Sequence, residues 1–241
     1  MKVFPILLAV LLLAPAASAS NGRSLYFANC VWCHGDHLQG VAGTSAHSSP
    51  GNEPAGGPPL LGVGALAADL YLTAGYMPLR SPTQEPKRRR PHFADADIAA
   101  LVGFIGAHGG PPVPQPHPER GNLATGLEIF TEHCAGCHQM AGEGGIVSGA
   151  SVPALKSATA TQIAEAVRVG PYVMPRFDKH DISPRELDSL VRYVLYTDHP
   201  NNSGGWSIGL LGPFPEGMVA WLIAGIALLA LARVIGEGIK R

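Results

Sequence analysis

All four cysteines of this chain stand in two short segments that share one pattern. Residues 30–34 read Cys-Val-Trp-Cys-His and residues 134–138 read Cys-Ala-Gly-Cys-His, so Cys-x-x-Cys-His occurs twice, 104 positions apart. A fold that accepts this sequence must therefore present the same five-residue motif in two separate places.

This spacing is suited to covalent haem attachment. Two cysteines three positions apart can form thioethers with the two vinyl groups of haem, and the histidine that follows is held beneath the iron. A disulfide or a thioredoxin-like site does not require the histidine, and a zinc site would need four ligands converging from both halves. We expect two covalently bound haem c groups, attached by Cys30, Cys33, Cys134 and Cys137, with His34 and His138 as axial iron ligands.

Two methionines are candidates for the second axial position. Met77 follows His34 by 43 residues and Met174 follows His138 by 36, and a proline comes directly after each methionine. That separation allows the chain to cross to the opposite haem face, where a thioether sulfur favours electron transfer. Core packing is the ordinary role of methionine, but Met140 lies too close to His138 to compete. We predict Met77 and Met174 as the sixth ligands.

Other histidines could compete for the iron, namely His37, His47, His92, His108, His133 and His180. They are scattered, with no equivalents between the halves, and most histidines are simply solvated or hydrogen-bonded. We expect no iron ligand among them.

The basic run Lys87-Arg88-Arg89-Arg90 has two interpretations. It could dock an acidic redox partner, or it could be a solvated turn before the next helix. We favour the solvated turn, because most such charge runs are solvated.

Helical periodicity is the main secondary-structure signal between the two ends of the chain. The apolar residues within 98–105 and within 187–194 follow the i, i+3, i+4, i+7 spacing of an amphipathic helix. Residues 183–186, Ser-Pro-Arg-Glu, form a capping box with proline at the first helical position. No strand pattern of any length appears, so the expected fold is all-α.

Each half also predicts a close crossing of its first and last helices. A glycine stands eight residues before each first cysteine and an aromatic residue four before it. Each last helix carries a leucine followed three positions later by an aromatic residue. We expect these groups to meet: Gly22 and Tyr26 with Leu101 and Phe104, and Gly126 and Phe130 with Leu190 and Tyr193.

The N-terminal residues have the features of a secretory signal peptide. Lys2 is followed by an apolar run from Val3 to Leu13 and then by Ala17-Ser18-Ala19, a small-residue cleavage site. The run is too short to span a bilayer, so removal of residues 1–19 is favoured over an uncleaved anchor. The mature chain would then lie outside the cytoplasm.

The C-terminal residues predict a membrane anchor rather than a buried soluble helix. Residues 217–235 contain one charge, Arg233, and would extend about 28 Å as a helix, close to a hydrocarbon core. Lys240 and Arg241 follow, and cationic flanks prefer the cytoplasm.

These observations divide the chain into seven parts. We predict a signal peptide at 1–19, two haem-binding domains at 20–110 and 120–200, a stiff proline-rich linker at 111–119, a connector at 201–213, a transmembrane helix at 214–236 and a cytoplasmic tail at 237–241.

The haem motifs and the helical pattern resemble class I cytochromes c in tandem. The stretch from Gly204 to Trp221 is similar to the membrane-entry segment of the dihaem cytochrome c subunit of actinobacterial-type quinol–cytochrome c reductases, the bcc complexes. Residues 165–175 and 62–65, and the basic turn before Phe93, are also similar to that family. Tyr76 departs from it, because a basic or polar residue is expected before the methionine.

The resemblance implies a membrane-anchored relay with His34–Met77 and His138–Met174 as axial pairs. It would take electrons from a Rieske iron–sulfur protein that works with a cytochrome b, and pass them towards a haem-copper oxidase. The haem domains would face the extracytoplasmic side. Oxidoreductase activity would belong to the complex, with no catalytic residue in this chain. The net charge of −1 gives no reason to expect a nucleic-acid partner.

Two alternatives stay open. The chain could serve another membrane dehydrogenase or oxidase, or it could be a dihaem peroxidase, which would need one haem without its distal ligand.

Overall fold

The structure is a computed structural model of the 241-residue chain. It describes residues 21–42, 56–80, 84–147, 150–198, 200 and 213–239. The predicted signal peptide, nearly all of the predicted connector and the last two residues lie outside the described residues. The chain forms two compact units, Met1–His199 and Pro200–Arg241.

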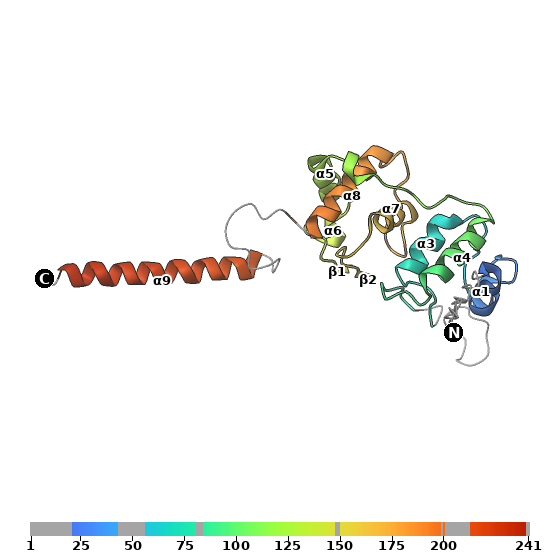
Figure 1. The fold of residues 1–241 in the computed structure, drawn as a ribbon, viewed down its shortest axis with the longest axis horizontal. Coiled ribbons are helices and arrows are strands. Elements are labelled where there is room, and N and C mark those ends of the chain that lie inside the picture. The colour runs from blue at the N-terminus through green and yellow to red at the C-terminus, as the bar shows by residue number, and fades with distance from the viewer. Residues whose placement is uncertain are drawn as a thin grey trace, which may run out of the picture. The chain divides into compact units, whose positions relative to one another are not determined.

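In the described part of the first half of the larger unit, the regular elements are helices joined by loops (Figure 1). Its helices are α1 (Gly22–Asn29), α2 (Val31–His34), α3 (Gly64–Thr73) and α4 (Asp95–Gly106). The Asn21 side chain caps α1 by accepting hydrogen bonds from the backbone N–H groups of Arg23 and Ser24. Helix α4 packs against both α1 and α3, around a core that includes the fully buried Tyr26 and Leu101.

The second half repeats this plan and adds a small hairpin. Its elements are α5 (Leu123–His133), α6 (Ala135–His138), β1 (Gly145–Val147), β2 (Ala150–Val152), α7 (Ala160–Val169) and α8 (Pro184–Asp198). Strands β1 and β2 are antiparallel, with Ile146 opposite Ser151. The core lies between α5, α7 and α8 and includes Phe130 and Leu190. The mainly helical fold is therefore confirmed, while the three-residue strands were too short to show a sequence pattern.

The predicted crossing of first and last helices is confirmed in both halves. A Cβ atom on Gly22 would collide with the carbonyl oxygen of Ala100, and one on Gly126 with that of Ser189. The ring centroids of Tyr26 and Phe104 are 5.3 Å apart. Phe130 and Tyr193 have the same separation of 5.3 Å. Glycine is required at both crossings because the backbones approach so closely.

The predicted capping box of α8 is also present. The Ser183 N–H donates to Glu186 Oε2 at 2.8 Å, and the Glu186 N–H donates to Ser183 Oγ at 3.4 Å. Helix α7 has a second capping box, between Thr159 and Gln162, which was not predicted.

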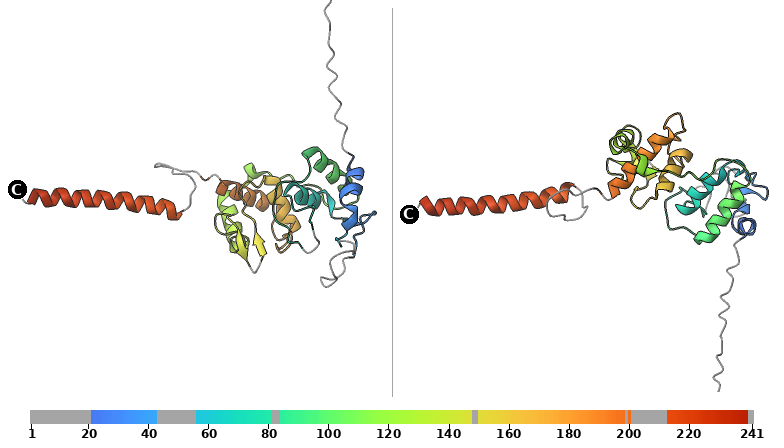
Figure 2. Two further views of the ribbon diagram at one scale, coloured as in Figure 1. Left: turned by 90° about the horizontal axis from the view of Figure 1, so that it is seen from below. Right: turned by 45° about the horizontal axis from the view of Figure 1, so that its top comes forward.

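The two halves are joined by an extended segment and by direct packing. Residues 111–117 have no regular secondary structure, and the 3-10 helix η1 (Pro118–Arg120) follows. Helix α3 of the first half packs against α7 of the second, and both views of Figure 2 show them as neighbours. The Gln162 Nε2 donates to Thr73 Oγ1 at 3.2 Å across this interface. The domain limits given above stay predictions.

The smaller unit contains helix α9 (Pro213–Ile239). Residues 217–238 form a 22-residue stretch that is long and apolar enough to cross a membrane, with a mean hydropathy of 2.3 over an 18-residue window. Arg233, the charge predicted within the span, pairs with Glu237 one turn later, with Nε and Oε1 3.0 Å apart.

Candidate haem sites

The two pentapeptides have the same backbone structure. In each, the first cysteine ends one helix and begins the next, so that the two cysteines and the histidine share a single helical turn. The N–H of His34 donates to Cys30 O and that of His138 to Cys134 O, both at 2.9 Å. This turn places two thiols and an imidazole on one short rigid segment.

Both histidines are oriented by a backbone carbonyl. His34 Nδ1 lies 2.8 Å from Pro58 O, and His138 Nδ1 lies 3.2 Å from Pro153 O. A Nδ1–H that donates to a carbonyl leaves the Nε2 lone pair free for a metal. Burial lowers the pKa of His138, and the hydrogen bond to Pro153 partly opposes this, so the neutral ligand form is favoured.

Cys30, Cys33 and Cys134 lie in partly shielded positions, and Cys137 is exposed. Burial, and then the neighbouring Cys33, raises the pKa of the Cys30 thiol to about 11. Burial and Cys137 raise the pKa of Cys134 to about 11 in the same way. Thioether formation adds an S–H group across the double bond of a vinyl group, so it consumes thiols in their protonated form. Within the described ranges, no group of three or more His, Cys, Asp or Glu side chains is arranged to hold a metal ion.

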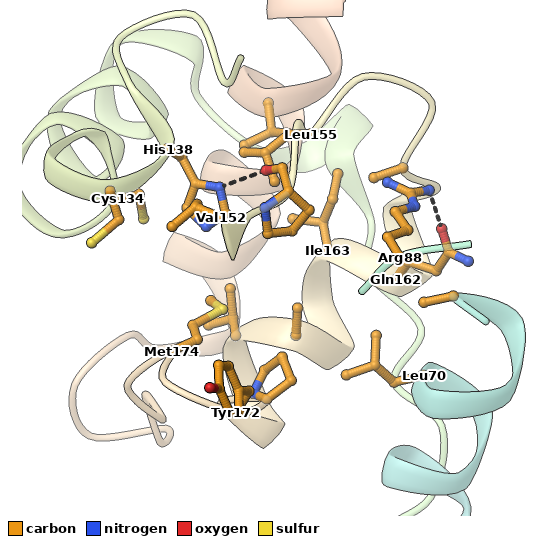
Figure 3. Close-up of a pocket in the computed structure, with 18 of the residues that line it drawn as sticks. Leu70, Arg88, Cys134, His138, Val152, Leu155, Gln162, Ile163, Tyr172 and Met174 are labelled. Atoms are coloured by element: carbon orange, nitrogen blue, oxygen red, sulfur yellow. Dashed lines mark hydrogen bonds between the residues drawn. The ribbon is translucent and has the colours of Figure 1, made fainter. Parts of the chain in front are cut away.

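The predicted site residues of the second half line one cavity (Figure 3). Cys134 lies at one end, and Cys137, in the same helical turn, also lines the cavity. His138 and Met174 lie on opposite sides of the space. The cavity encloses about 1280 Å³, its opening to solvent included. The lining is mainly apolar, which suits a planar macrocycle held between a nitrogen and a sulfur.

Two of the four predicted site residues of the first half pack against one core. Cys30 and Met77 both pack against the cluster that contains Tyr26 and Leu101. The backbone N–H of Met77 donates to Tyr71 O at 3.0 Å, which holds the residue just after α3. Together with the oriented imidazole of His34, this arrangement resembles that of the second half.

The competing histidines are mostly engaged elsewhere. His108 Nδ1 lies 2.8 Å from Phe104 O, and the His92 ring meets Phe93 edge to face. His133 is among the residues that line the second cavity, but its ring makes a tilted contact with Phe177. His47 lies outside the described residues.

The interpretation of Lys87–Arg90 as a solvated turn is wrong for one member. Arg88 is half-buried between the halves, where its Nη2 donates to Ser157 O at 2.9 Å and to Gln162 Oε1 at 3.1 Å. Lys87, Arg89 and Arg90 remain exposed.

Sequence reasoning did not foresee the places of four residues at these sites: Pro58 and Pro153, whose carbonyls orient the histidines, and Tyr76 and Arg88, which line the second cavity. No spacing rule could reveal the carbonyls, because Pro58 follows its histidine by 24 residues and Pro153 by 15.

Two family models match the chain. The cytochrome c model matches residues 19–108. The model described as cytochrome C oxidase, cbb3-type, subunit III matches residues 121–194.

Curated relatives match nearly the whole chain. The cytochrome bc1 complex cytochrome c subunit of Mycobacterium tuberculosis is 35% identical over 232 residues, which cover 92% of this chain and 78% of that protein. The protein of the same name from Corynebacterium diphtheriae is 31% identical over 240 residues, covering 92% of this chain and 81% of that protein. The chain belongs to the cytochrome bc1 complex cytochrome c subunit family.

Membership of this family settles the cofactor and the general role. A bc1 complex cytochrome c subunit of this kind carries covalently bound haem c and transfers electrons in a membrane-associated bc-type complex. Oxidoreductase activity is a property of the complex. Among solved structures, cytochrome c4 from Pseudomonas stutzeri covers 72% of this chain and 95% of that chain at 21% identity, with a TM-score of 0.24. A similarity that low adds nothing to the argument.

Proposed function

We propose that this chain relays electrons from the Rieske centre of a quinol–cytochrome c reductase towards a haem-copper oxidase. The observation that carries the proposal is the position of His138 and Met174 on opposite sides of one apolar cavity, with the cysteines at its end. A haem bound there supplies a one-electron couple with no open coordination position, which favours electron transfer over oxygen or peroxide chemistry.

Each residue has a separate role in this proposal. The thiols of Cys30, Cys33, Cys134 and Cys137 hold the two haems covalently. His34 and His138 bind iron through Nε2, because Nδ1 is engaged with a proline carbonyl. Met77 and Met174 complete the coordination, and the apolar walls exclude water and so tune the potential.

The partners follow from the relatives, which are subunits of bc1 complexes. We expect a cytochrome b and a Rieske protein beside this chain. We also expect the haem domains on the extracytoplasmic face, and α9 crossing the bilayer to a cytoplasmic C-terminus because Lys240 and Arg241 follow it. An anchor at one end keeps both haems near the membrane.

Replacement of the methionine sulfur tests the coordination. In Met174→Ala, we expect the oxidised protein to lose about half of the weak red absorption band that marks methionine on ferric iron. The midpoint potential of one haem should fall, because the soft ligand that favours the reduced state is gone. Met77→Ala should do the same for the other haem. Met140→Ala is the control, because this exposed methionine lies two residues beyond His138. An unchanged spectrum in either ligand variant would contradict the assignment.

Purification tests the partners and the two alternatives. The complex, solubilised gently and captured through this chain, should contain b-type haem and an electron paramagnetic resonance signal of a Rieske cluster, and quinol should reduce its haem c. Copurification with another dehydrogenase instead would favour the first alternative. A stable high-spin haem with peroxide turnover would favour the peroxidase.

A further inference from the structure

The cavity of the second half is completed by the first half. Five residues from the first half line it, and they come from α3 and from the segment that follows: Leu70, Ala74, Tyr76, Pro86 and Arg88. The second haem would thus lie against both halves rather than within one domain.

The cavity has a defined direction. Figure 3 shows Cys134 at one end and Arg88 with Gln162 at the opposite end, while His138 and Met174 stand on the two sides between them. In haem the two vinyl-bearing pyrroles occupy one edge, and the two propionate-bearing pyrroles occupy the opposite edge. Thioether bonds at Cys134 and Cys137 therefore direct the propionates towards Arg88.

Arg88 has the donors that a carboxylate needs. In the described structure its hydrogen bonds to Ser157 O and Gln162 Oε1 engage Nη2, at 2.9 and 3.1 Å. They hold the guanidinium in place and leave Nη1 and Nε for another acceptor. An arginine fork matches a carboxylate with two parallel hydrogen bonds, and partial burial strengthens such a charge-assisted pair.

Tyr76 offers a second donor from the same half. Only 9% of the residue is exposed, and its ring lies in edge contact with Tyr71, with centroids 5.8 Å apart. A buried phenol needs a hydrogen-bond partner, and a propionate would provide one.

We propose that Arg88, assisted by Tyr76, binds the propionates of the haem that is attached to the second half. This positioning role rests on the proposed ligands His138 and Met174, and it extends beyond them. Tyr76 precedes Met77, the proposed ligand of the first haem, so one residue of the first half contacts the second haem while its neighbour binds the first. The docking of the two halves and the path of electrons between the two haems then depend on the same short segment, which contains Tyr76 and Met77.

Redox titration of the full complex tests this proposal. In Arg88→Ala, we expect the potential of the second haem to fall, because the lost positive charge leaves a propionate uncompensated and favours ferric iron. A roughly tenfold change in the reduction equilibrium corresponds to about 59 mV for a one-electron couple. The potential of the first haem should change little. The Met174→Ala variant identifies which of the two transitions in the redox titration belongs to the second haem.

Arg90→Ala is the matched control, because it removes the same charge from an exposed position in the same run. Arg88→Lys keeps the charge but not the fork and should show a smaller fall. Should Arg88→Ala fail to assemble, Arg88→Lys and Tyr76→Phe carry the test. The proposal is overturned if the Arg88 variants change the potentials of both haems equally. It is also overturned if their effect on the potential of the second haem is no larger than that of Arg90→Ala.

Failure of this proposal is distinguishable from failure of the ligand assignment. Arg88 variants should retain the red methionine band whatever their potentials. If the Arg88 variants left the potential of the second haem unchanged while Met174→Ala still changed the spectrum and the potential as expected, only the propionate contact would be rejected.

Discussion

The residue after each haem pentapeptide adopts a backbone conformation that ordinarily requires glycine. Gly35 has φ 77° and ψ 158°, and Gln139 at the equivalent position has φ 66° and ψ 165°. This turn sends the chain back towards the carbonyls of Pro58 and Pro153, which orient the histidines. A residue with a side chain in this range of φ and ψ costs roughly 1–3 kcal/mol, so Gln139 strains the second half, while Gly35 avoids that strain in the first half.

Gln139→Gly should therefore stabilise the second half by about 1 kcal/mol. Relief of the strain exceeds the entropy that glycine adds to the unfolded chain. Denaturant unfolding of the holoprotein, followed by circular dichroism and by the haem spectrum, measures the effect. Gly35→Ala is the reciprocal variant and should destabilise the first half. An equal loss of stability in both variants would show that Gln139 is not strained.

At the scale of helices, each half depends on one close crossing. Helix α1 meets α4 at Gly22, and α5 meets α8 at Gly126, with no room for a Cβ atom at either glycine. These crossings bring the start of each pentapeptide against the core, so a shift of the helices would move the histidine relative to its methionine.

Gly126→Ala should destabilise the second half by at least about 2 kcal/mol. The new methyl group would meet the backbone carbonyl of Ser189, which cannot move without displacing α8. Thermal unfolding of the holoprotein and the intensity of the methionine band measure the two consequences. Gly103→Ala in α4 is the control, because its Cβ meets nothing within 4 Å. That change should be neutral or stabilising by up to about 1 kcal/mol. Equal effects from the two substitutions would contradict the crossing argument.

Local patterns explain what could be predicted from the sequence. The pentapeptides, the apolar helix faces and the capping box of α8 depend on residues within a few positions of each other, so their spacing is visible in the chain. Arg88 could not be placed, because its partner Ser157 is 69 residues away and only packing of the two halves brings them together. The hairpin β1–β2 has three residues in each strand, too few for a periodic signal.

At the scale of the whole larger unit, polar groups cross the boundary between the halves. Arg88 donates to Ser157, and the backbone N–H of Ser151 donates to Glu85 Oε1 at 2.7 Å. Within this boundary Glu165 of α7 is fully buried and faces Asp69 of α3. Neither oxygen of Glu165 has a hydrogen-bond partner of standard geometry in the described part of the chain. An unpaired buried carboxylate is costly, so the group is held as the neutral acid.

This carboxyl should make docking of the halves sensitive to alkaline pH. Burial, and then the nearby Asp69, raises the pKa of Glu165 from its ordinary 4.5 to about 9. The folded chain thus holds a proton that the unfolded chain releases above about 4.5. Its contribution to stability therefore falls as the pH rises from about 4.5 to about 9.

Glu165→Gln should remove this dependence, because the amide has nearly the same shape and never ionises. We expect the melting temperature of the variant, relative to the unmodified holoprotein, to rise steadily between pH 6 and pH 9, since the raised pKa of Glu165 lies at the top of this window. Glu128→Gln, an exposed change on α5, controls for the loss of one negative charge. Parallel melting curves for Glu165→Gln and the unmodified chain across this window would mean that Glu165 already ionises freely. The halves would then have to admit water between α3 and α7.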